Sequence, residues 1–277
     1  MTDVSGTTRL AAVIGSPVRH SLSPALHNAA FKASGLDWRC LAFEVSAGNA
    51  GTALAGMRAL GIGGLAVTTP HKRDVALAVD AVDPASRALE SVNTVVLRED
   101  GSTFGASTDG AGFVDSVRAA GVGLEGARIV VLGAGGAARS IIEALGRSHV
   151  ADIAIVNRTE SSAVAAACLS DLARVGSTDD IEGADLLVNA TSIGMGTDQV
   201  PLDVGLVRSD LVVADIVYHP LETALLRAAQ ACGAITIDGL GMLIHQAVLQ
   251  QELWTGVRPD PGVMRTAAET ALARRPG

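Results

Sequence analysis

Long apolar runs, cysteine and lysine are scarce in this sequence, and each scarcity excludes a class of protein. No apolar stretch approaches the ~18 residues that would suggest a membrane span. Residues 1–8 contain neither a basic nor an apolar segment, so no secretory signal is expected and the expected location is cytoplasmic. The cysteines form no CxxC pair and no even set, and their apolar neighbours predict buried thiols without chemistry at Cys40, Cys168 and Cys232.

Basic residues are outnumbered by acidic ones. The chain has 21 Lys and Arg against 29 Asp and Glu, a formal net charge of −8. This balance, with no basic block, disfavours nucleic acid and acidic membranes as partners and predicts a small-molecule partner. The six histidines show no ligand spacing such as HxxxH, so no metal is expected. A homodimer is one candidate assembly.

Only two of the basic residues are lysines, Lys32 and Lys72. Lys72 ends a Pro-His-Lys turn in a chain that otherwise uses arginine almost everywhere. An amine can release a proton there, which a guanidinium cannot do, so the choice hints at proton transfer. Lys32 has no comparable setting.

The pattern along the chain alternates short apolar runs with helical stretches, which is typical of βαβ units and a mainly parallel sheet. Ser23-Pro24 predicts the N-cap and first residue of a helix. Asp100-Gly101 predicts the turn of a hairpin. The first series of expected strands covers 10–14, 41–45, 64–68, 95–97 and 103–106, and the second covers 128–132, 152–156, 185–189, 211–217 and 234–237.

The second series begins after an expected helix at 110–121, and the stretches 240–254 and 261–274 are helical with no further strand. These last helices should pack back onto the first series. We therefore predict an α/β chain of two three-layer domains. One covers 1–110 and 240–277, the other is inserted as 111–239, and a ligand cleft lies between them.

A dinucleotide-binding turn is predicted at Gly133-Ala134-Gly135-Gly136-Ala137-Ala138. It follows the apolar run 129–132 and opens a helix, which is the context that a GxGxxA motif requires. Gly133 permits a tight turn, Gly135 lets the backbone approach a pyrophosphate, and Ala138 permits close helix packing. The inserted domain is therefore expected to be a Rossmann-type domain that binds a nicotinamide cofactor.

The end of the next strand predicts which cofactor is used. Folds selective for NAD place a carboxylate there to bind the ribose 2′-hydroxyl, whereas this chain has Asn157-Arg158-Thr159. Arg158 offers a planar cation for a 2′-phosphate, so NADP is favoured over NAD.

The domain formed by 1–110 and 240–277, called the outer domain below, has several segments whose polar groups are poorly explained by folding alone. Ser21-Leu22-Ser23 puts two hydroxyls at a helix N-terminus, which suits a carboxylate. Thr68 to Lys72 directly follows a strand, and Asn93-Thr94 precedes another. Thr108-Asp109-Gly110 opens the helix that leads into the inserted domain, which places an acid at the junction.

Taken together, these segments resemble the shikimate dehydrogenase family over essentially the whole chain. The matching motifs are Gly15-Ser16-Pro17, Ser21-Leu22-Ser23-Pro24, Val67-Thr68-Thr69-Pro70-His71-Lys72, Val92-Asn93-Thr94, Thr108-Asp109-Gly110, Gly133-Ala134-Gly135-Gly136-Ala137, Asn157-Arg158-Thr159, Asn189-Ala190-Thr191, Asp215-Ile216-Val217-Tyr218 and Asp238-Gly239-Leu240-Gly241-Met242 with Gln246.

The resemblance implies NADPH-dependent reduction of 3-dehydroshikimate to shikimate, a step toward aromatic amino acids. It implies that the outer domain binds a cyclohexene carboxylic acid and carries the catalysis, with Lys72 and Asp109 as the acid-base pair. Ser21 and Ser23 would bind the carboxylate, and the other substrate ligands would be Thr68, Asn93, Tyr218 and Gln246. The cofactor ligands would be Gly133, Ala134, Gly135, Gly136, Ala137, Asn157, Arg158, Thr159 and Thr191, with Ile216, Gly239 and Met242 on the nicotinamide side.

Two positions depart from the family pattern. Its usual Asn-Val-Thr is Ala66-Val67-Thr68 here, and its usual Asn-Thr-Asp is Ser107-Thr108-Asp109. The lost amide at Ala66 leaves a quinate or aminoshikimate dehydrogenase as an alternative. A non-catalytic NADP-binding sensor and a reductase of open-chain or folate substrates are further alternatives. The presence of Lys72 and Asp109 argues against the sensor, and the paired serines with Gln246 argue against the second reductase.

Overall fold

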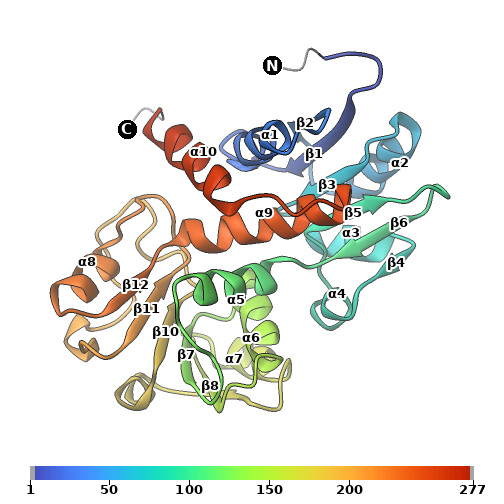
Figure 1. The fold of residues 1–277 in the computed structure, drawn as a ribbon. Helices are drawn as coiled ribbons and strands as arrows, with labels where there is room; N and C mark the ends of the chain where they lie inside the picture. The colour runs from blue at the N-terminus through green and yellow to red at the C-terminus, as the bar shows by residue number, and fades with distance from the viewer. Residues whose placement is uncertain (1–3, 275–277) are drawn as a thin grey trace. The chain divides into compact units, whose positions relative to one another are not determined.

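The computed structural model describes residues 4–274, which fold into two compact α/β units. Unit 1 is formed by the residues up to Thr108 together with those from Ile244 onward, and unit 2 is Asp109–Leu243. The second boundary falls inside one long helix, α9 (Gly239–Thr255), so the chain returns to unit 1 without a linker. Each unit is built on its own sheet (Figure 1).

Unit 1 has a mixed sheet in the order β2-β1-β3-β5-β6-β4. The first three strands are parallel, and β5 and β6 form the expected antiparallel hairpin, in which Gly101 has a φ of +82°. The strands are β1 (Arg9–Gly15), β2 (Trp38–Glu44), β3 (Gly64–Val67), β4 (Ala81–Val82), β5 (Thr94–Leu97) and β6 (Thr103–Ala106). The helices are α1 (Ser23–Ala33), α2 (Ala50–Leu60), α3 (Lys72–Ala78), α4 (Pro84–Leu89) and α10 (Pro261–Ala273), with most of α9.

Unit 2 has a parallel sheet in the order β12-β11-β10-β7-β8-β9. Counted from β7, this is the 3-2-1-4-5-6 order of a Rossmann fold, with its switch point between β7 and β10. The strands are β7 (Arg128–Leu132), β8 (Asp152–Val156), β9 (Ala173–Val175), β10 (Leu186–Asn189), β11 (Val212–Asp215) and β12 (Ile235–Ile237). The helices are α5 (Asp109–Ala119), α6 (Gly136–Gly146), α7 (Glu160–Ala167) and α8 (Ala224–Ala231), with short 3-10 turns η1 (Thr178–Gly183) and η2 (Val204–Leu206).

The central strands of both sheets are buried on both faces, so each unit has three layers. In β7, Ile129 and Val131 belong to one apolar cluster with α5 and α6, whereas Val130 and Leu132 belong to a second cluster with α8. Unit 1 repeats this alternation, with separate clusters on the two faces of β1. The fold class predicted from the strand and helix pattern is confirmed.

The start of α1 differs from the prediction. The N-cap is Leu22 and not Ser23, no side chain makes a capping hydrogen bond, and Ser23 is the first helical residue. Pro24 still occupies the first turn, because its missing N–H costs nothing there. The predicted cap position is therefore wrong by one residue, although the helix itself is present.

Helix α9 completes the core of unit 1 from the far end of the chain. The indole Nε1 of Trp254 donates to the carbonyl of Val95 at 3.1 Å, and a side chain at Gly64 would collide with the indole ring. The ring of His27 in α1 lies 4.7 Å from that of Trp254. The helices expected at 240–254 and 261–274 do therefore pack onto the first series, α9 on the sheet and α10 beside α1 (Figure 1).

The expectation of three buried thiols is wrong for two of them. Cys168 and Cys232 are exposed, each as the C-cap residue of its helix, α7 or α8. Cys40 is buried, and burial raises the pKa of its thiol to about 12. Among residues 4–274 no helix is both long and apolar enough to cross a membrane.

Candidate functional site

The predicted dinucleotide turn connects β7 to α6 in unit 2. The amide of Gly133 donates to the carbonyl of Val156 in β8 at 2.9 Å, so the chain turns directly at the sheet edge. Gly133 has a φ of +107°, and a Cβ there would lie 3.0 Å from the carbonyl oxygen of Ala190 and 3.1 Å from Cγ2 of Thr191. Only glycine fits this conformation and this spacing.

Open space lies above the start of α6. Added side chains at Gly135 or Gly136 would meet no atom within 4 Å, whereas Ala138 is fully buried against the sheet. The first amides of a helix have no partner within the helix, and they carry the positive end of its dipole. The turn therefore offers a cradle of N–H groups that fits a pyrophosphate, with Ala134 and Ala137 at its rim.

The segment at the end of β8 lies beside this turn. Leu132 and Val156 are paired in register, so Asn157 follows its strand at the same sheet edge as Gly133. The side-chain Nδ2 of Asn157 donates to the carbonyl of Thr159 at 2.9 Å and shapes the loop, while Arg158 is exposed. None of these three residues carries a carboxylate, and the exposed guanidinium fits a 2′-phosphate.

The remaining predicted cofactor residues follow β10, β11 and β12 at the same edge. Thr191 lies against Gly133, as the spacing above shows. The amide of Ile216 donates to the carbonyl of Asn189 at 3.1 Å. A side chain at Gly239 would collide with the carbonyl oxygens after β11, and Met242 packs on the core below. Unit 2 thus brings the twelve predicted cofactor residues to one sheet edge.

A second cluster of predicted residues gathers at one edge of the unit 1 sheet. The amide of Thr68 donates to the carbonyl of Ile14 at 3.0 Å, and the carbonyl of Asn93 accepts from Val67 at 2.7 Å. Because β5 runs antiparallel to β3, its start and the end of β3 meet at this edge. Lys72 begins α3 there, and its carbonyl accepts from Val92 at 3.0 Å.

The side chain of Asn93 is buried and fully engaged. Its Nδ2 donates to Oγ1 of Thr108 at 3.0 Å, and its Oδ1 accepts from the Thr108 amide at 2.9 Å and the Thr94 hydroxyl at 2.8 Å. Asn93 therefore fixes the residue that precedes Asp109. In this structure the Asn93 side chain holds Thr94 and Thr108 together at this edge of the unit 1 sheet, in addition to any contact with a substrate.

Ser21 and Ser23 lie where the chain enters α1, after β1 ends at the same edge. Oγ of Ser21 accepts from the Ser23 amide at 3.2 Å, so the two residues form one compact turn. Gln246 lies on α9, 7% exposed. One turn further along α9, Nε2 of Gln250 donates to the carbonyl of Asn93 at 3.2 Å.

Two predicted residues fall in unit 2 and not with this cluster. Tyr218 follows β11, and Asp109 is the first residue of α5. A side chain at Gly110 would collide with the backbone of Ser140, so the glycine allows α5 to lie directly on α6. Lys72 belongs to unit 1 and Asp109 to unit 2, and the pairing of their side chains stays a prediction.

Buried polar residues that sequence reasoning missed support both clusters. In unit 1 they are His27 and Gln250, whose Nε2 and Oε1 lie 3.2 Å apart. In unit 2 they are Asn189 and Asp215, joined at 2.9 Å. The sequence could have pointed to Asn189 and Asp215, because both belong to motifs quoted above. No sequence motif pointed to His27 and Gln250.

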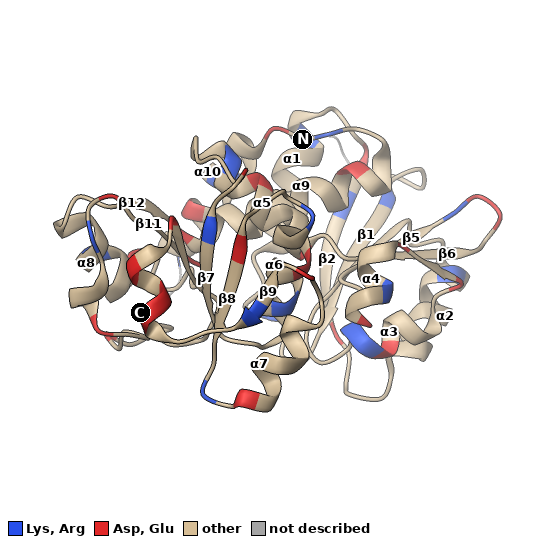
Figure 2. Ribbon diagram, turned by 90° about the horizontal axis from the view of Figure 1, so that it is seen from below, with Lys and Arg blue, Asp and Glu red and all other residues tan. Residues whose placement is uncertain are grey.

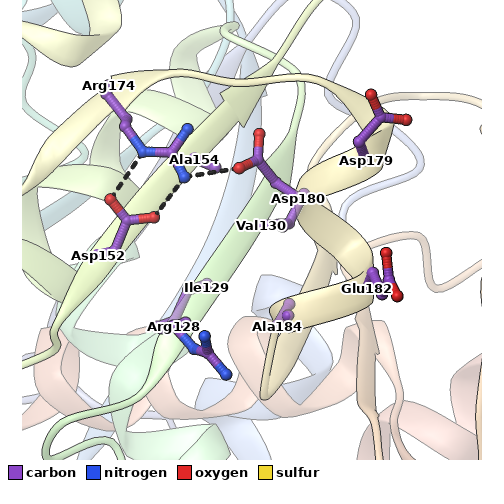
Figure 3. A pocket seen from close by; sticks show the side chains of 11 residues that line it. Arg128, Ile129, Val130, Asp152, Ala154, Arg174, Asp179, Asp180, Glu182 and Ala184 are labelled. Carbon is purple, nitrogen blue, oxygen red and sulfur yellow. Dashed lines mark hydrogen bonds and ion pairs between the residues drawn. The ribbon is translucent and has the colours of Figure 1, made fainter.

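Charged residues of both signs are spread over the elements of both units (Figure 2). In unit 2, Arg174 binds Asp152 and Asp180 at 2.8 and 2.6 Å, beside a pocket of about 370 Å³ (Figure 3). The hydrogen bonds that Asp180 accepts from Arg174 and from the backbone amide of Ser177 hold the pKa of its carboxyl below the usual value. The pocket opens at the amino ends of β7 and β8, so it is not the predicted cofactor site. Among the residues described, no group of three or more His, Cys, Asp or Glu could hold a metal ion.

Comparison with known families matches three segments of the chain. Residues 13–95 match the shikimate dehydrogenase substrate binding domain. Residues 117–193 match the shikimate / quinate 5-dehydrogenase family, and residues 239–269 match the shikimate 5′-dehydrogenase C-terminal domain. The first match covers most of the edge described in unit 1, and the second covers the dinucleotide turn.

Individual relatives match over nearly their full length. A shikimate dehydrogenase (NADP(+)) of Thermococcus kodakarensis is 45% identical over 94% of this chain and 96% of its own. The crystal structure of shikimate 5-dehydrogenase from Thermus thermophilus with NADP(H) and shikimate has a TM-score of 0.89 at 36% identity, covering 95% of this chain and 99% of that one. Quinate dehydrogenase from Corynebacterium glutamicum with NAD has a TM-score of 0.88 at 32% identity, covering 95% and 99%.

Proposed function

Because this chain belongs to the shikimate dehydrogenase family, we propose that it catalyses the NADPH-dependent reduction of 3-dehydroshikimate to shikimate. The observation that carries the proposal is the 45% identity to the Thermococcus enzyme over nearly the whole of both chains. The turn at Gly133 and the exposed Arg158 support NADP as the cofactor.

Different groups of residues bind different parts of NADPH. The N–H groups at the start of α6 hold the pyrophosphate, and Arg158 pairs with the 2′-phosphate. Thr191, Ile216, Gly239 and Met242 bind the nicotinamide side. When bound, NADPH supplies the hydride that reduces the ketone.

The substrate residues recognise a carboxylate and a ring of hydroxyl groups. The hydroxyls of Ser21 and Ser23 bind the carboxylate at the start of α1. Thr68, Asn93, Gln246 and, from unit 2, Tyr218 bind the ring oxygens. In this assignment unit 1 is the substrate-binding and catalytic domain and unit 2 is the NADP-binding domain.

Lys72 and Asp109 complete the reaction. A ketone that accepts a hydride becomes an alkoxide, which must take a proton. The ammonium group of Lys72 donates that proton, and it takes one back when shikimate is oxidised. Asp109 orients the ammonium group and stabilises its charge.

One observation supports a related acid as the second candidate substrate. Ala66 stands where the family has Asn, and it is only 4% exposed, in a cluster with Val13 and Trp254. The side chain therefore offers no hydrogen bond at the substrate edge. The second candidate substrate is quinate or aminoshikimate. These acids differ from shikimate in the ring or in one ring substituent.

The test is the rate of NADP⁺ reduction by the purified protein with shikimate, quinate and aminoshikimate as separate substrates. We expect shikimate to have the highest kcat/KM. A higher value with either of the other acids would transfer the assignment to that acid. Absence of turnover with all three would refute the proposal.

A further inference from the structure

A pair of buried polar side chains lies beneath the loops that follow β10 and β11, and the proposed chemistry does not use it. Asn189 is 0% exposed and Asp215 is 2% exposed. They are paired in register on neighbouring parallel strands, and Nδ2 of Asn189 donates to Oδ1 of Asp215 at 2.9 Å. Burying such groups costs free energy unless hydrogen bonds compensate it, so their partners indicate their role.

Asn189 organises the loop after β10. Its Oδ1 accepts from the backbone amide of Thr191 at 3.1 Å and from the Thr191 hydroxyl at 2.7 Å. Its Nδ2 also donates to the carbonyl of Ile193 at 3.1 Å. Both donors and the acceptor oxygen of the amide are engaged, so the loop from 189 to 193 is wrapped around one side chain.

Asp215 organises the loop after β11. Its Oδ1 also accepts from the Val217 amide at 3.0 Å, and its Oδ2 accepts from Oγ1 of Thr223 at 2.8 Å. Thr223 is the N-cap of α8, where it accepts from the Leu226 amide at 3.3 Å. One carboxylate therefore anchors both ends of the segment 216–222.

The three partners of the Asp215 carboxylate are all donors. An ionised carboxylate can accept from all three at once. Burial raises the pKa of Asp215, and the hydrogen bonds from Val217, Thr223 and Asn189 oppose that rise. An amide in place of the carboxylate would turn an N–H toward at least one of these donors.

The two loops border the dinucleotide turn but not the whole cofactor site. Thr191 and the carbonyl of Ala190 lie against Gly133, and the amide of Ile216 donates to the carbonyl of Asn189. Arg158 follows β8, on the other side of β7. Movement of the two loops would therefore disturb Thr191 and Ile216 and leave the adenosine end of the site unchanged.

We infer that Asp215, acting through Asn189 and Thr223, is a positioning residue that holds the loops carrying Thr191 and Ile216 at a fixed distance from the dinucleotide turn. It thereby sets where the nicotinamide ring lies. This inference rests on the proposed function, because it takes Thr191 and Ile216 as residues of the nicotinamide side.

The test compares four variants of the full chain. Asp215→Asn keeps the shape but replaces the acceptor, and Asp203→Asn makes the same change at the exposed cap of η2 in the same unit. Thr223→Val removes the hydroxyl, and Thr223→Ser restores it. Each protein is measured for kcat with shikimate and NADP⁺, for the fluorescence of bound NADPH, and for the affinity of adenosine 2′,5′-bisphosphate, which has no nicotinamide.

We expect Asp215→Asn and Thr223→Val to lower kcat by about 10- to 100-fold, since a misplacement of about 1 Å can cost 10²-fold. The fluorescence of bound NADPH should change in the same two variants, while their affinity for the bisphosphate stays at the parent value. Thr223→Ser and Asp203→Asn should match the parent in all three measurements.

Parental kcat and NADPH fluorescence in Asp215→Asn would overturn the inference. A loss of bisphosphate affinity as large as the loss of kcat would also overturn it, because the carboxylate would then support the fold of unit 2 as a whole. If Asp215→Asn does not fold, the comparison of Thr223→Val with Thr223→Ser decides. If the parent does not oxidise shikimate, the proposed function fails, and the NADPH fluorescence still tests the positioning role.

Discussion

The stability of unit 1 should fall at mildly acid pH because of one histidine. His27 is fully buried, its Nε2 lies 3.2 Å from Oε1 of Gln250, and its ring lies near those of Phe31 and Trp254. Burial lowers its pKa from 6.5 to about 4, against the opposing effect of the amides of Gln250 and Gln251. The folded protein therefore holds this ring neutral at pH values where the unfolded chain protonates it.

The sign and size of the effect follow from that difference. Between pH 6.5 and about 4 the unfolded state binds a proton that the folded state does not, so stability falls as the pH is lowered. Because a tenfold change in an equilibrium corresponds to about 1.4 kcal/mol, the full effect is about 3 kcal/mol. It is absent above pH 7 and complete near pH 4.

Urea unfolding at pH 7, 6, 5 and 4 measures this directly when the parent is compared with His27→Gln. The amide can still donate to Gln250 but does not titrate, and carboxylates that titrate in the same range act equally on both proteins. Between pH 7 and 4, the free energy of unfolding should fall by about 3 kcal/mol less in the variant than in the parent. A difference between parent and His27→Gln that does not vary with pH would refute the reasoning.

Three further predictions concern the proposed reaction. Lys72→Ala should lower kcat by roughly 10² to 10⁴ in steady-state shikimate oxidation, whereas Lys32→Ala, at the only other lysine, should not. Equal kcat values for the parent and Lys72→Ala would remove Lys72 from the mechanism. Arg158→Ala should reduce the preference for NADP⁺ over NAD⁺ by about 1.5 to 3 kcal/mol, measured as the ratio of kcat/KM with the two cofactors. A parent that uses NAD⁺ equally well would contradict the assignment. Gly133→Ala should lower stability by about 1 to 3 kcal/mol and weaken NADP⁺ binding in calorimetric titration, because its Cβ would press on Ala190 at a φ that alanine disfavours. Parental affinity in that variant would show that the turn tolerates a side chain.

Features that depend on neighbouring residues could be predicted from the sequence. The turn at Gly133 is recognisable because strand, glycines and helix follow one another within a short segment, and the hairpin at Gly101 is recognisable for the same reason. The strands β4 and β9 were missed because two or three residues are too few to show a period. The start of α1 was placed one residue late because a hydroxyl at Ser23 looks like a cap whether or not it makes the bond.

Features that depend on tertiary packing could not be predicted. His27 and Gln250 are 223 positions apart in the chain, and no local pattern connects them. Asn189 and Asp215 meet because β10 and β11 are neighbours in register, which only the strand order reveals. The exposure of Cys168 and Cys232 likewise depends on which side of each helix faces the sheet, and apolar sequence neighbours do not decide that.

The return of α9 to unit 1 determines the order in which the chain can fold as it leaves the ribosome. Unit 2 is continuous from Asp109 to Leu243, so all of its strands are available before α9 is complete. Unit 1 lacks Trp254 until then, and its sheet has an uncovered face where that indole later binds Val95. Domains generally fold as units, so we expect the inserted unit to become native first although it is made second. Pulsed hydrogen exchange on ribosome-bound chains arrested before Trp254 has emerged tests this, because amides of β7 should already be protected while those of β3 are not.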